Sequence, residues 1–386
     1  MAAEPILGID LGTTFSTAAV VLDGRFHYAL DVRGDPCIPS VVHFPKTGPP
    51  VVGFEAEKLR VTDAVNTISG IKRVIGRGIT SGPARILDAS SAFKIKGVGD
   101  AEVSVVTRAG EFTASQVASC IVRHLKERAE LRFARRFTKC FMTVPVAAGP
   151  EVHRAMVRIG KMAGLEVLRL ISEPVAGALA RGIGGAKGPE APVLVYDFGG
   201  GTLDTSIIQR QGERISVRAT GGDDCLGGND LDLAFARHVA AAIWGMASID
   251  VSKDVILFDR IQRQCELVKR ALSVSKEARF FVADALGTPG QRRSLDVMVK
   301  REQLVAPWSE LVQRSLAVAS ETIAAAGVRP NELAAVMLIG GTTFVPMVRE
   351  AVSQALPAPL DLEADPQTAV ARGAAILSVM PRLLLD

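Results

Sequence analysis

Residues Val193–Asp204 read VLVYDFGGGTLD, and this stretch predicts a buried strand that ends in an anion-binding turn. The continuous apolar run Val193–Tyr196 is typical of a strand buried on both faces. Glycines follow Asp197, and glycine allows a tight turn that brings backbone N–H groups against an anion. Asp197 and Asp204 flank the glycines, so their carboxylates could hold a hydrated metal ion and position a water molecule.

A second stretch of the same kind lies near the N-terminus, where residues 6–20 read ILGIDLGTTFSTAAV. Asp10 ends its apolar run and is followed by a glycine and two threonines. One glycine-rich turn is a weak signal on its own. Two of them, each continuing as strand, turn and strand, indicate duplicated lobes. We therefore expect ATP clamped between two similar lobes, with its phosphates against both turns.

Composition limits the class of protein. At 386 residues the chain is long enough for two lobes with separate cores. It is 48% hydrophobic and 22% charged, and its net charge of +4 does not favour a nucleic-acid-binding protein. The basic run 132–136 (RFARR) lies on a predicted helix over Ser115–Phe137, so we interpret it as a solvated helix face.

Cysteine usage and the absence of long apolar runs indicate a compartment. The 5 cysteines are scattered and show no C-x-x-C spacing, which argues against a disulfide framework and a zinc site. They favour a reducing environment, and we expect a cytoplasmic protein. The first residues lack the basic segment and apolar core of a signal peptide. No apolar run of about twenty residues occurs, so we expect no membrane span.

Several segments, taken together, resemble the ATPase domain of the DnaK-type 70-kDa heat-shock chaperones. They are GIDLGTTFS (8–16), ISEPVAGALARG (171–182), VYDFGGGTLDTSI (195–207), LIGGTTFVP (338–346) and PQTAVARGAAI (366–376). The wider family includes actins and sugar kinases, which have the same two-lobed ATP clamp. Two further segments, IKRVIGR (71–77) and CELVKRALS (265–273), favour the chaperone branch.

The resemblance implies an α/β fold of two similar actin-like lobes, each with a mixed five-stranded sheet and flanking helices, around a deep nucleotide cleft. The predicted boundaries are 1–182 for lobe I with a peripheral insertion over about 39–112, 183–360 for lobe II with an insertion over about 227–302, 361–380 for a C-terminal helix returning to lobe I, and 381–386 for the start of an interdomain linker. We interpret the glycine-rich stretch Gly182–Pro192 as the hinge between the lobes.

The resemblance also assigns roles at the phosphate end of the cleft. Phosphate contacts are expected from Gly12, Thr13, Thr14, Gly199, Gly200, Gly201 and Thr202. Mg²⁺, which dehydrates reluctantly, is expected to be held mostly through water by Asp10, Asp197 and Glu173. The predicted catalytic residues are Lys72, Glu173, Asp197, Thr202 and Asp204. Among them Lys72 would reach the γ-phosphate, and Asp204 would orient the attacking water.

A purely structural interpretation competes for each of these residues. An aspartate at a strand end is often only a turn residue or a helix cap. An isolated lysine such as Lys72 is often a surface residue. The two matching loops favour the functional interpretation for Asp10, Asp197 and Asp204, and the resemblance favours it for Lys72.

The resemblance places adenosine, of ATP or ADP, against glycine-rich backbone and one helical face. The expected contacts on this side are Gly340, Gly341, Glu266, Lys269, Arg270 and Ser273, and further expected nucleotide contacts are Phe15, Gly228, Thr342 and Phe344. The four residues from the helix are spaced three or four apart, which places them on one face. The same spacing is also typical of a solvated helix face.

The chain departs from the family pattern at several positions. Phe344 stands where an arginine usually packs on adenine, and an aromatic ring could stack there instead. His153 stands where the family has an arginine of its interdomain relay. Gln367 replaces a frequent acidic residue, so the K⁺ site that the family allows is expected to be altered.

Three functions remain open from the sequence. The resemblance implies the slow ATPase of a chaperone, with ATP, its own peptide-binding domain beyond Asp386, a J-domain co-chaperone and a nucleotide-exchange factor as partners. The alternative is an ATP-sensing regulatory or assembly protein of the same fold with little turnover. A small-molecule kinase is the third, although nothing in the sequence indicates a substrate pocket near Asp204. We expect a monomer, with neither nucleic acid nor membrane as a partner.

Overall fold

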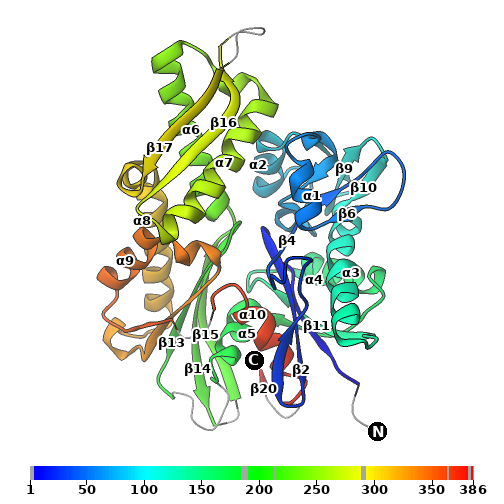
Figure 1. The fold of residues 1–386 in the computed structure, drawn as a ribbon. Coiled ribbons are helices and arrows are strands. Elements are labelled where there is room, and N and C mark those ends of the chain that lie inside the picture. Colours follow the sequence, from blue (N-terminus) through cyan, green and yellow to red (C-terminus); the bar gives the residue numbers. More distant parts are fainter. Residues whose placement is uncertain are drawn as a thin grey trace.

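Two lobes stand side by side in the computed structural model and meet at their bases (Figure 1). The structure describes residues 4–183, 190–212, 214–287, 293–362, 365–380 and 384–385. Most of the predicted hinge, residues 184–189, therefore lies outside the described residues, as do four residues of the predicted linker. Of the helices in the described part of the chain, none is long and apolar enough to cross a membrane.

The sheet of lobe I joins a parallel half to an antiparallel half. Its strand order is β12 (Glu166–Ser172), β11 (Lys139–Val144), β1 (Leu7–Asp10), β2 (Phe15–Leu22) and β3 (Arg25–Tyr28), with the short β4 (Ile38–Pro39) beside β2. β1 runs parallel to β11 and antiparallel to β2, so it stands at the centre. Asp10 ends this central strand, where the predicted turn begins.

The sheet of lobe II repeats this arrangement. Its order is β19 (Leu360–Asp361), β18 (Ala335–Ile339), β13 (Val193–Phe198), β14 (Leu203–Gln211), β15 (Arg214–Asp223) and the short β20 (Leu384–Leu385). β13 is parallel to β18 and antiparallel to β14, and it is buried along its whole length. The predicted fold class, two actin-like lobes with mixed five-stranded sheets, is confirmed.

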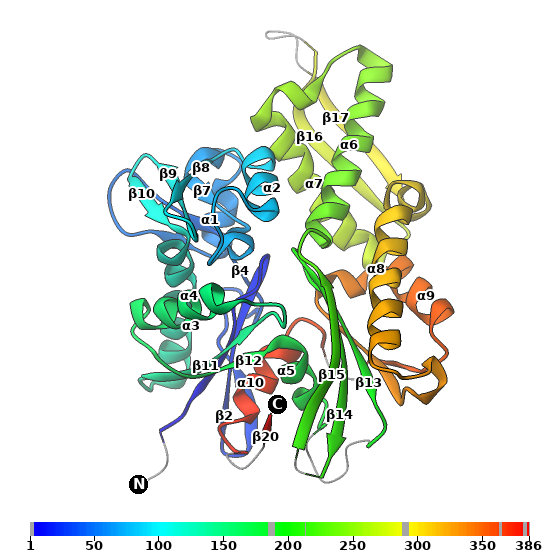
Figure 2. The ribbon, with the colours of Figure 1, turned by 180° about the vertical axis from the view of Figure 1, so that it is seen from behind.

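Helices cover both sheets and fill the space between them (Figures 1 and 2). The outer helices are α3 (Ala114–Phe133), α4 (Pro150–Met162), α8 (Val305–Ala325) and α9 (Pro346–Ala355), and the inner ones are α5 (Glu173–Ala180) and α10 (Ala369–Ile376). The two inner helices touch through small residues, because a Cβ added at Gly373 would lie 1.6 Å from the carbonyl oxygen of Ala176. α10 is shorter than the long final helix that the sequence pattern predicts.

Each inner helix belongs to the core of both halves. Val370 of α10 and Val175 of α5 share a buried cluster with Val195 and Ile339 of the lobe II sheet. On another face of α10, Ala371 and Ala375 pack against Ala19 of the lobe I sheet. The base of the cleft is therefore a continuous packed layer rather than a loose linker.

A smaller module stands on the upper end of each sheet. In lobe I it contains β5 (Val42–His43), β6 (Val51–Val52), α1 (Phe54–Leu59), η1 (Ala64–Asn66), β7 (Thr67–Ile68), η2 (Ile71–Val74), α2 (Gly82–Ser90), β8 (Lys94–Val98), β9 (Glu102–Thr107) and β10 (Gly110–Thr113). In lobe II it contains α6 (Gly228–Ala247), η3 (Val251–Lys253), α7 (Val255–Val274), β16 (Glu277–Leu286), β17 (Arg293–Lys300) and η4 (Arg301–Leu304). The remaining 3₁₀ turns of lobe II are η5 (Pro330–Glu332) and η6 (Gly341–Phe344).

The sequence NTISGIKRVIG (66–76) predicts one short helix carrying Lys72 and Arg73, and this prediction is wrong. Two 3₁₀ turns, η1 and η2, flank strand β7 instead. Gly70 interrupts the segment with φ 69°, a left-handed conformation that cannot continue a helix. η2 then places Lys72 and Arg73 at the inner end of the module, facing the cleft and lobe II.

Candidate active site

A cleft with about 880 Å³ of empty space, partly open to solvent, lies between the lobes. Of the residues predicted from the sequence, it brings together Asp10, Gly12, Thr13, Thr14, Phe15, Lys72, Glu173, Asp197, Gly199, Gly200, Gly201, Thr202, Gly228, Glu266, Lys269, Arg270, Gly340, Gly341 and Thr342. The cleft does not include Asp204, Ser273 or Phe344 in its lining.

The two glycine-rich loops face each other across the cleft at close range. A Cβ at Gly200 would lie 1.9 Å from Thr14 Oγ1, and one at Gly201 would lie 2.6 Å from Thr13 Oγ1. No side chain fits at either position without displacing the opposite loop. Glycine at these positions leaves room for the hydroxyls of Thr13 and Thr14 from the opposite loop, so both loops can present donors to the same space.

Three buried carboxylates, Glu173, Asp197 and Asp204, and the half-buried Asp10 gather beside these loops. Asp10 ends β1, Asp197 is the next-to-last residue of β13, Glu173 begins α5, and Asp204 pairs with Asp197 in register. Burial, followed by the repulsion of Glu173, raises the pKa of Asp204 to about 7. Burial, followed by the repulsion of Glu173 and other carboxylates, also raises the pKa of Asp197 well above its usual value.

The same cluster raises the pKa of Asp10 to about 6, mainly because the carboxyl is buried. A surplus of buried negative charge fits a divalent cation, which oxygen ligands such as carboxylates bind. Within the described ranges, no three ligating side chains converge closely enough to form a direct metal site. The carboxylate chemistry of the cluster is of the kind that Mg²⁺ accepts.

Lys72 is the positive charge of this cluster. Its Nζ donates to Glu173 Oε1 at 2.6 Å, and their side chains are only 13% and 6% exposed. Burial alone would lower the pKa of Lys72, but Glu173 and Asp10 outweigh burial and raise it. Lys72 therefore stays charged and can neutralise a phosphate oxygen. The structure excludes the alternative that Lys72 is an ordinary surface lysine.

The side of the cleft that the sequence assigns to adenosine is built from η6 and α7. Gly340 has φ 81°, and a Cβ there would lie 2.4 Å from the Phe198 carbonyl oxygen. Thr342 Oγ1 donates to the Gly199 carbonyl oxygen at 2.8 Å, which joins this loop to the phosphate loop. On α7, the guanidinium of Arg270 lies 4.9 Å from the centre of the Phe15 ring, across the cleft.

Two predicted adenosine contacts lie elsewhere. Ser273 Oγ donates to the Lys269 carbonyl oxygen within α7, so its hydroxyl is used by the helix itself. Phe344 packs under Arg349, whose guanidinium is 5.1 Å from the ring centre. Lys269 lines the cleft, but its Nζ also pairs with Asp232 at 2.6 Å.

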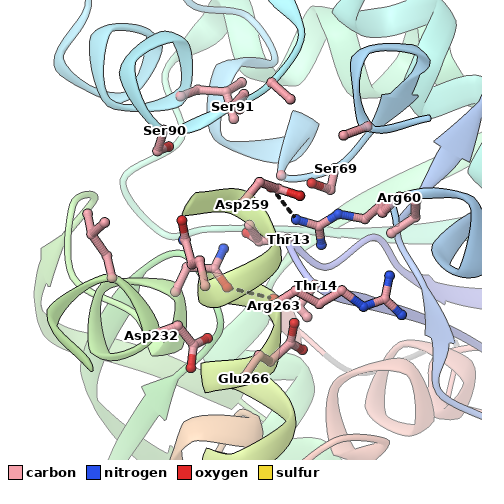
Figure 3. Close-up of a pocket in the computed structure, with 18 of the residues that line it drawn as sticks. Thr13, Thr14, Arg60, Ser69, Ser90, Ser91, Asp232, Asp259, Arg263 and Glu266 are labelled. Atoms are coloured by element: carbon pink, nitrogen blue, oxygen red, sulfur yellow. Dashed lines mark hydrogen bonds and ion pairs between the residues drawn. The ribbon is translucent and has the colours of Figure 1, made fainter. Parts of the chain in front are cut away.

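A second cavity, which no pattern in the sequence indicated, lies above the cleft between the two upper modules (Figure 3). Arg60 Nη2 lies 3.1 Å from Asp259 Oδ1, an ion pair that joins α1's end to α7 (Figure 3). Asn229, which accepts a hydrogen bond from Thr14 Oγ1, lines both cavities. Only its position directly after Gly228 could have marked Asn229 in the sequence, and nothing there pairs Arg60 with Asp259.

The raised pKa of Asp204 predicts how stability depends on pH. An unfolded aspartate has a pKa of about 4, so the unfolded chain ionises first and the stability of the nucleotide-free protein falls as pH rises from about 4 to about 7. Asp204→Asn, which does not titrate, should therefore raise the free energy of unfolding more at about pH 8 than at about pH 5, by on the order of 1–3 kcal/mol. Urea unfolding at the two pH values tests this, and an equal gain at both would contradict it.

The comparison with known families decides between the open functions. A protein-family model described as Hsp70 protein matches residues 6–381. The chain belongs to the Hsp70 family. Its two-lobed cleft is accordingly that of an ATP-dependent chaperone ATPase domain, which binds ATP and ADP and hydrolyses ATP. The Hsp70 match covers both lobes and all of the cleft residues named above.

The family assignment also explains why the cleft combines two phosphate loops with an acidic cluster. Hsp70 proteins hydrolyse ATP, and phosphoryl transfer to water depends on positioning and on neutralised charge rather than on a covalent intermediate. In this Hsp70 protein the two phosphate loops and the acidic cluster line the same cleft.

Proposed function

We propose that this Hsp70 protein binds Mg²⁺·ATP in the cleft and cleaves it with the residues gathered around Lys72. The observation that carries the proposal is the buried Lys72–Glu173 pair among carboxylates, at the point where the two phosphate loops meet. Backbone N–H groups of Gly12–Thr14 and Gly199–Thr202 would bind the phosphates. The hydroxyls of Thr13, Thr14 and Thr202 would add donors.

Mg²⁺, when bound, would neutralise charge on the β- and γ-phosphates. Asp10, Asp197 and Glu173 would hold it, mostly through water. Lys72 would donate to a γ-phosphate oxygen, because its raised pKa keeps it protonated. Asp204, the carboxyl whose pKa is about 7, would orient the attacking water and can accept its proton near neutral pH.

On the adenosine side, Arg270, Glu266 and Gly341 are proposed to contact the nucleoside, with Phe15 next to Arg270. Ser273 and Phe344 would support the site from behind rather than touch the base. Binding of a monovalent cation such as K⁺ stays a prediction. Gln367, which replaces the acidic residue frequent in the family, lines the cleft with a neutral amide.

Coupling to a peptide-binding domain, a J-domain co-chaperone and a nucleotide-exchange factor are further parts of the proposal, as are a monomeric state and a cytoplasmic location. Strand β20, which extends the lobe II sheet beside β15, supports coupling. A segment added to a sheet edge would follow the movement of that lobe. His153 stands where the family has an arginine of its interdomain relay. Its Nδ1 lies 2.9 Å from the carbonyl oxygen of Gly149, the residue that precedes α4, so this contact is local to the helix.

Single-turnover hydrolysis tests the proposal directly. With excess protein and Mg²⁺, acid quenching should show ATP converted to ADP and phosphate. EDTA should reduce the rate by on the order of a hundredfold or more, because the metal's charge neutralisation is lost. Tight ATP binding with unchanged cleavage after EDTA would contradict the assigned role of the carboxylates.

A further inference from the structure

A separate cavity lies behind the phosphate loops. Its inner wall is formed by Lys72, Thr13 and Thr202, which also line the nucleotide cleft. The residues of the adenosine side do not contribute to it. Its other walls are Arg73, Ile75, Arg77, Pro83, Pro145, Ala148, Val152, Met156 and Asp224. The cavity therefore adjoins the position of the γ-phosphate from the side opposite to adenosine.

The charge inside this cavity suits an anion. Three of its lining residues are basic, namely Lys72, Arg73 and Arg77, whereas Asp224 is its one acidic lining residue in the described part of the chain. Apolar side chains form much of the remaining wall. Each of the three basic residues is paired with a carboxylate, Glu173, Asp230 or Asp224, so an anion would depend on a donor that these pairs leave unused.

Arg73 provides a buried donor at the inner end. The residue is 8% exposed, and its Nη2 pairs with Asp230 at 2.9 Å. Its Nε finds no acceptor among the described residues. A Cβ at Gly201 would lie 2.9 Å from this Nε, so the donor sits beside the second phosphate loop. Buried N–H groups normally have a partner, and an oxygen of a leaving phosphate would supply one.

An ion pair closes the outer end. Arg77 Nη2 lies 2.7 Å from Asp224 Oδ2, and the two side chains are 29% and 40% exposed. Arg77 follows η2 of lobe I, whereas Asp224 follows β15 of lobe II, so the pair bridges the lobes. A bridge between lobes can open when they rotate, and a half-exposed pair opens at low cost.

We propose that orthophosphate released by ATP hydrolysis leaves through this cavity, with Arg73 as its transient hydrogen-bond donor and the Arg77–Asp224 pair as its gate. The inference rests on the proposed function, because it needs a phosphate formed beside Lys72. The passage forms and breaks no covalent bond. It lets phosphate depart while ADP still occupies the cleft, since ADP would block the route past the adenosine side.

Single-turnover kinetics with two readouts tests the route. Acid quenching measures cleavage, and a fluorescent phosphate-binding reporter measures phosphate in solution. Ala148→Trp narrows the cavity and should leave cleavage within about twofold while slowing phosphate release about tenfold, which gives a lag. Val152→Phe, on α4, also narrows the cavity. It replaces Ala148→Trp if that variant proves less stable than the parent protein. Arg77→Ala and Asp224→Ala should shorten any lag seen in the parent.

The control is Arg60→Ala, which breaks another ion pair between the lobes, away from this cavity. It should not change the delay between cleavage and phosphate release. If phosphate appears as fast as it is formed in a folded narrowing variant, the proposed route is wrong. If quenching shows no cleavage in the parent, the proposed function fails instead, so the two failures are distinguishable.

Discussion

Lys72→Ala is expected to slow ATP cleavage by on the order of a hundredfold to a thousandfold while ATP still binds, because one preorganised charge at the γ-phosphate is lost. The binding contacts of both phosphate loops and of the adenosine side remain. Quenched-flow cleavage and equilibrium nucleotide binding, measured on the same preparation, separate the two effects. Cleavage at the parent rate would contradict the role of Lys72.

The same substitution should destabilise the protein, and this offers a sharper control. Glu173 is 5% exposed and would be left as a buried charge without its lysine. Lys72→Ala combined with Glu173→Met should recover stability but not cleavage. Lys269→Ala is the matched control, because it also removes a buried lysine from its ion pair with a buried carboxylate, here Asp232. It should weaken nucleotide binding more than it slows cleavage of bound ATP.

Asp197→Asn is expected to make the nucleotide-free protein more stable and nearly inactive. Burial, followed by repulsion from Glu173, Asp204 and Asp10, raises the pKa of Asp197. A neutral amide of the same shape removes the repulsion but also one of the charges that would attract Mg²⁺. We expect cleavage to fall about a hundredfold or more, and Mg²⁺ to lose most of its effect on ATP binding.

Asp232→Asn is the matched control for this second prediction. Asp232 is as deeply buried, and burial raises its pKa to about 7, but its partner is the ammonium of Lys269. Removing its charge leaves the Lys269 ammonium buried without its ion pair, a cost that offsets the gain expected from the raised pKa, so the rise in melting temperature should be much smaller than at Asp197. Calorimetry without nucleotide, at about pH 8, measures both. A loss of stability in Asp197→Asn would contradict our account of the cluster.

The sequence predicted those parts of the site that depend on local backbone chemistry. Both phosphate loops have a glycine at a close approach, Gly12 beside the Phe15 carbonyl oxygen and Gly200 beside Thr14 Oγ1, and such glycines are visible as motifs. The strand-end positions of Asp10 and Asp197 follow from the apolar runs before them. The pairing of Asp197 with Asp204 follows from the tight turn between β13 and β14.

The parts that depend on tertiary contacts could not be predicted in the same way. Helical spacing placed Ser273 on the right face, but its hydroxyl bonds back into the last turn of α7. The left-handed Gly340 and the 3₁₀ turn after it direct Phe344 toward Arg349. Arg60 and Asp259 meet only because the two lobes face each other, and no local pattern records that.

The crossing of α5 and α10 at the base has a consequence for how the molecule opens. Tight packing through Gly373 leaves α5 and α10 little freedom to separate, so we expect their crossing to be the pivot about which the two lobes rotate. A given rotation then displaces residues near this pivot the least and residues of the two upper modules the most. The Arg60–Asp259 contact between the upper modules would part first, while the phosphate loops, nearer the pivot, would still lie close together (Figure 2).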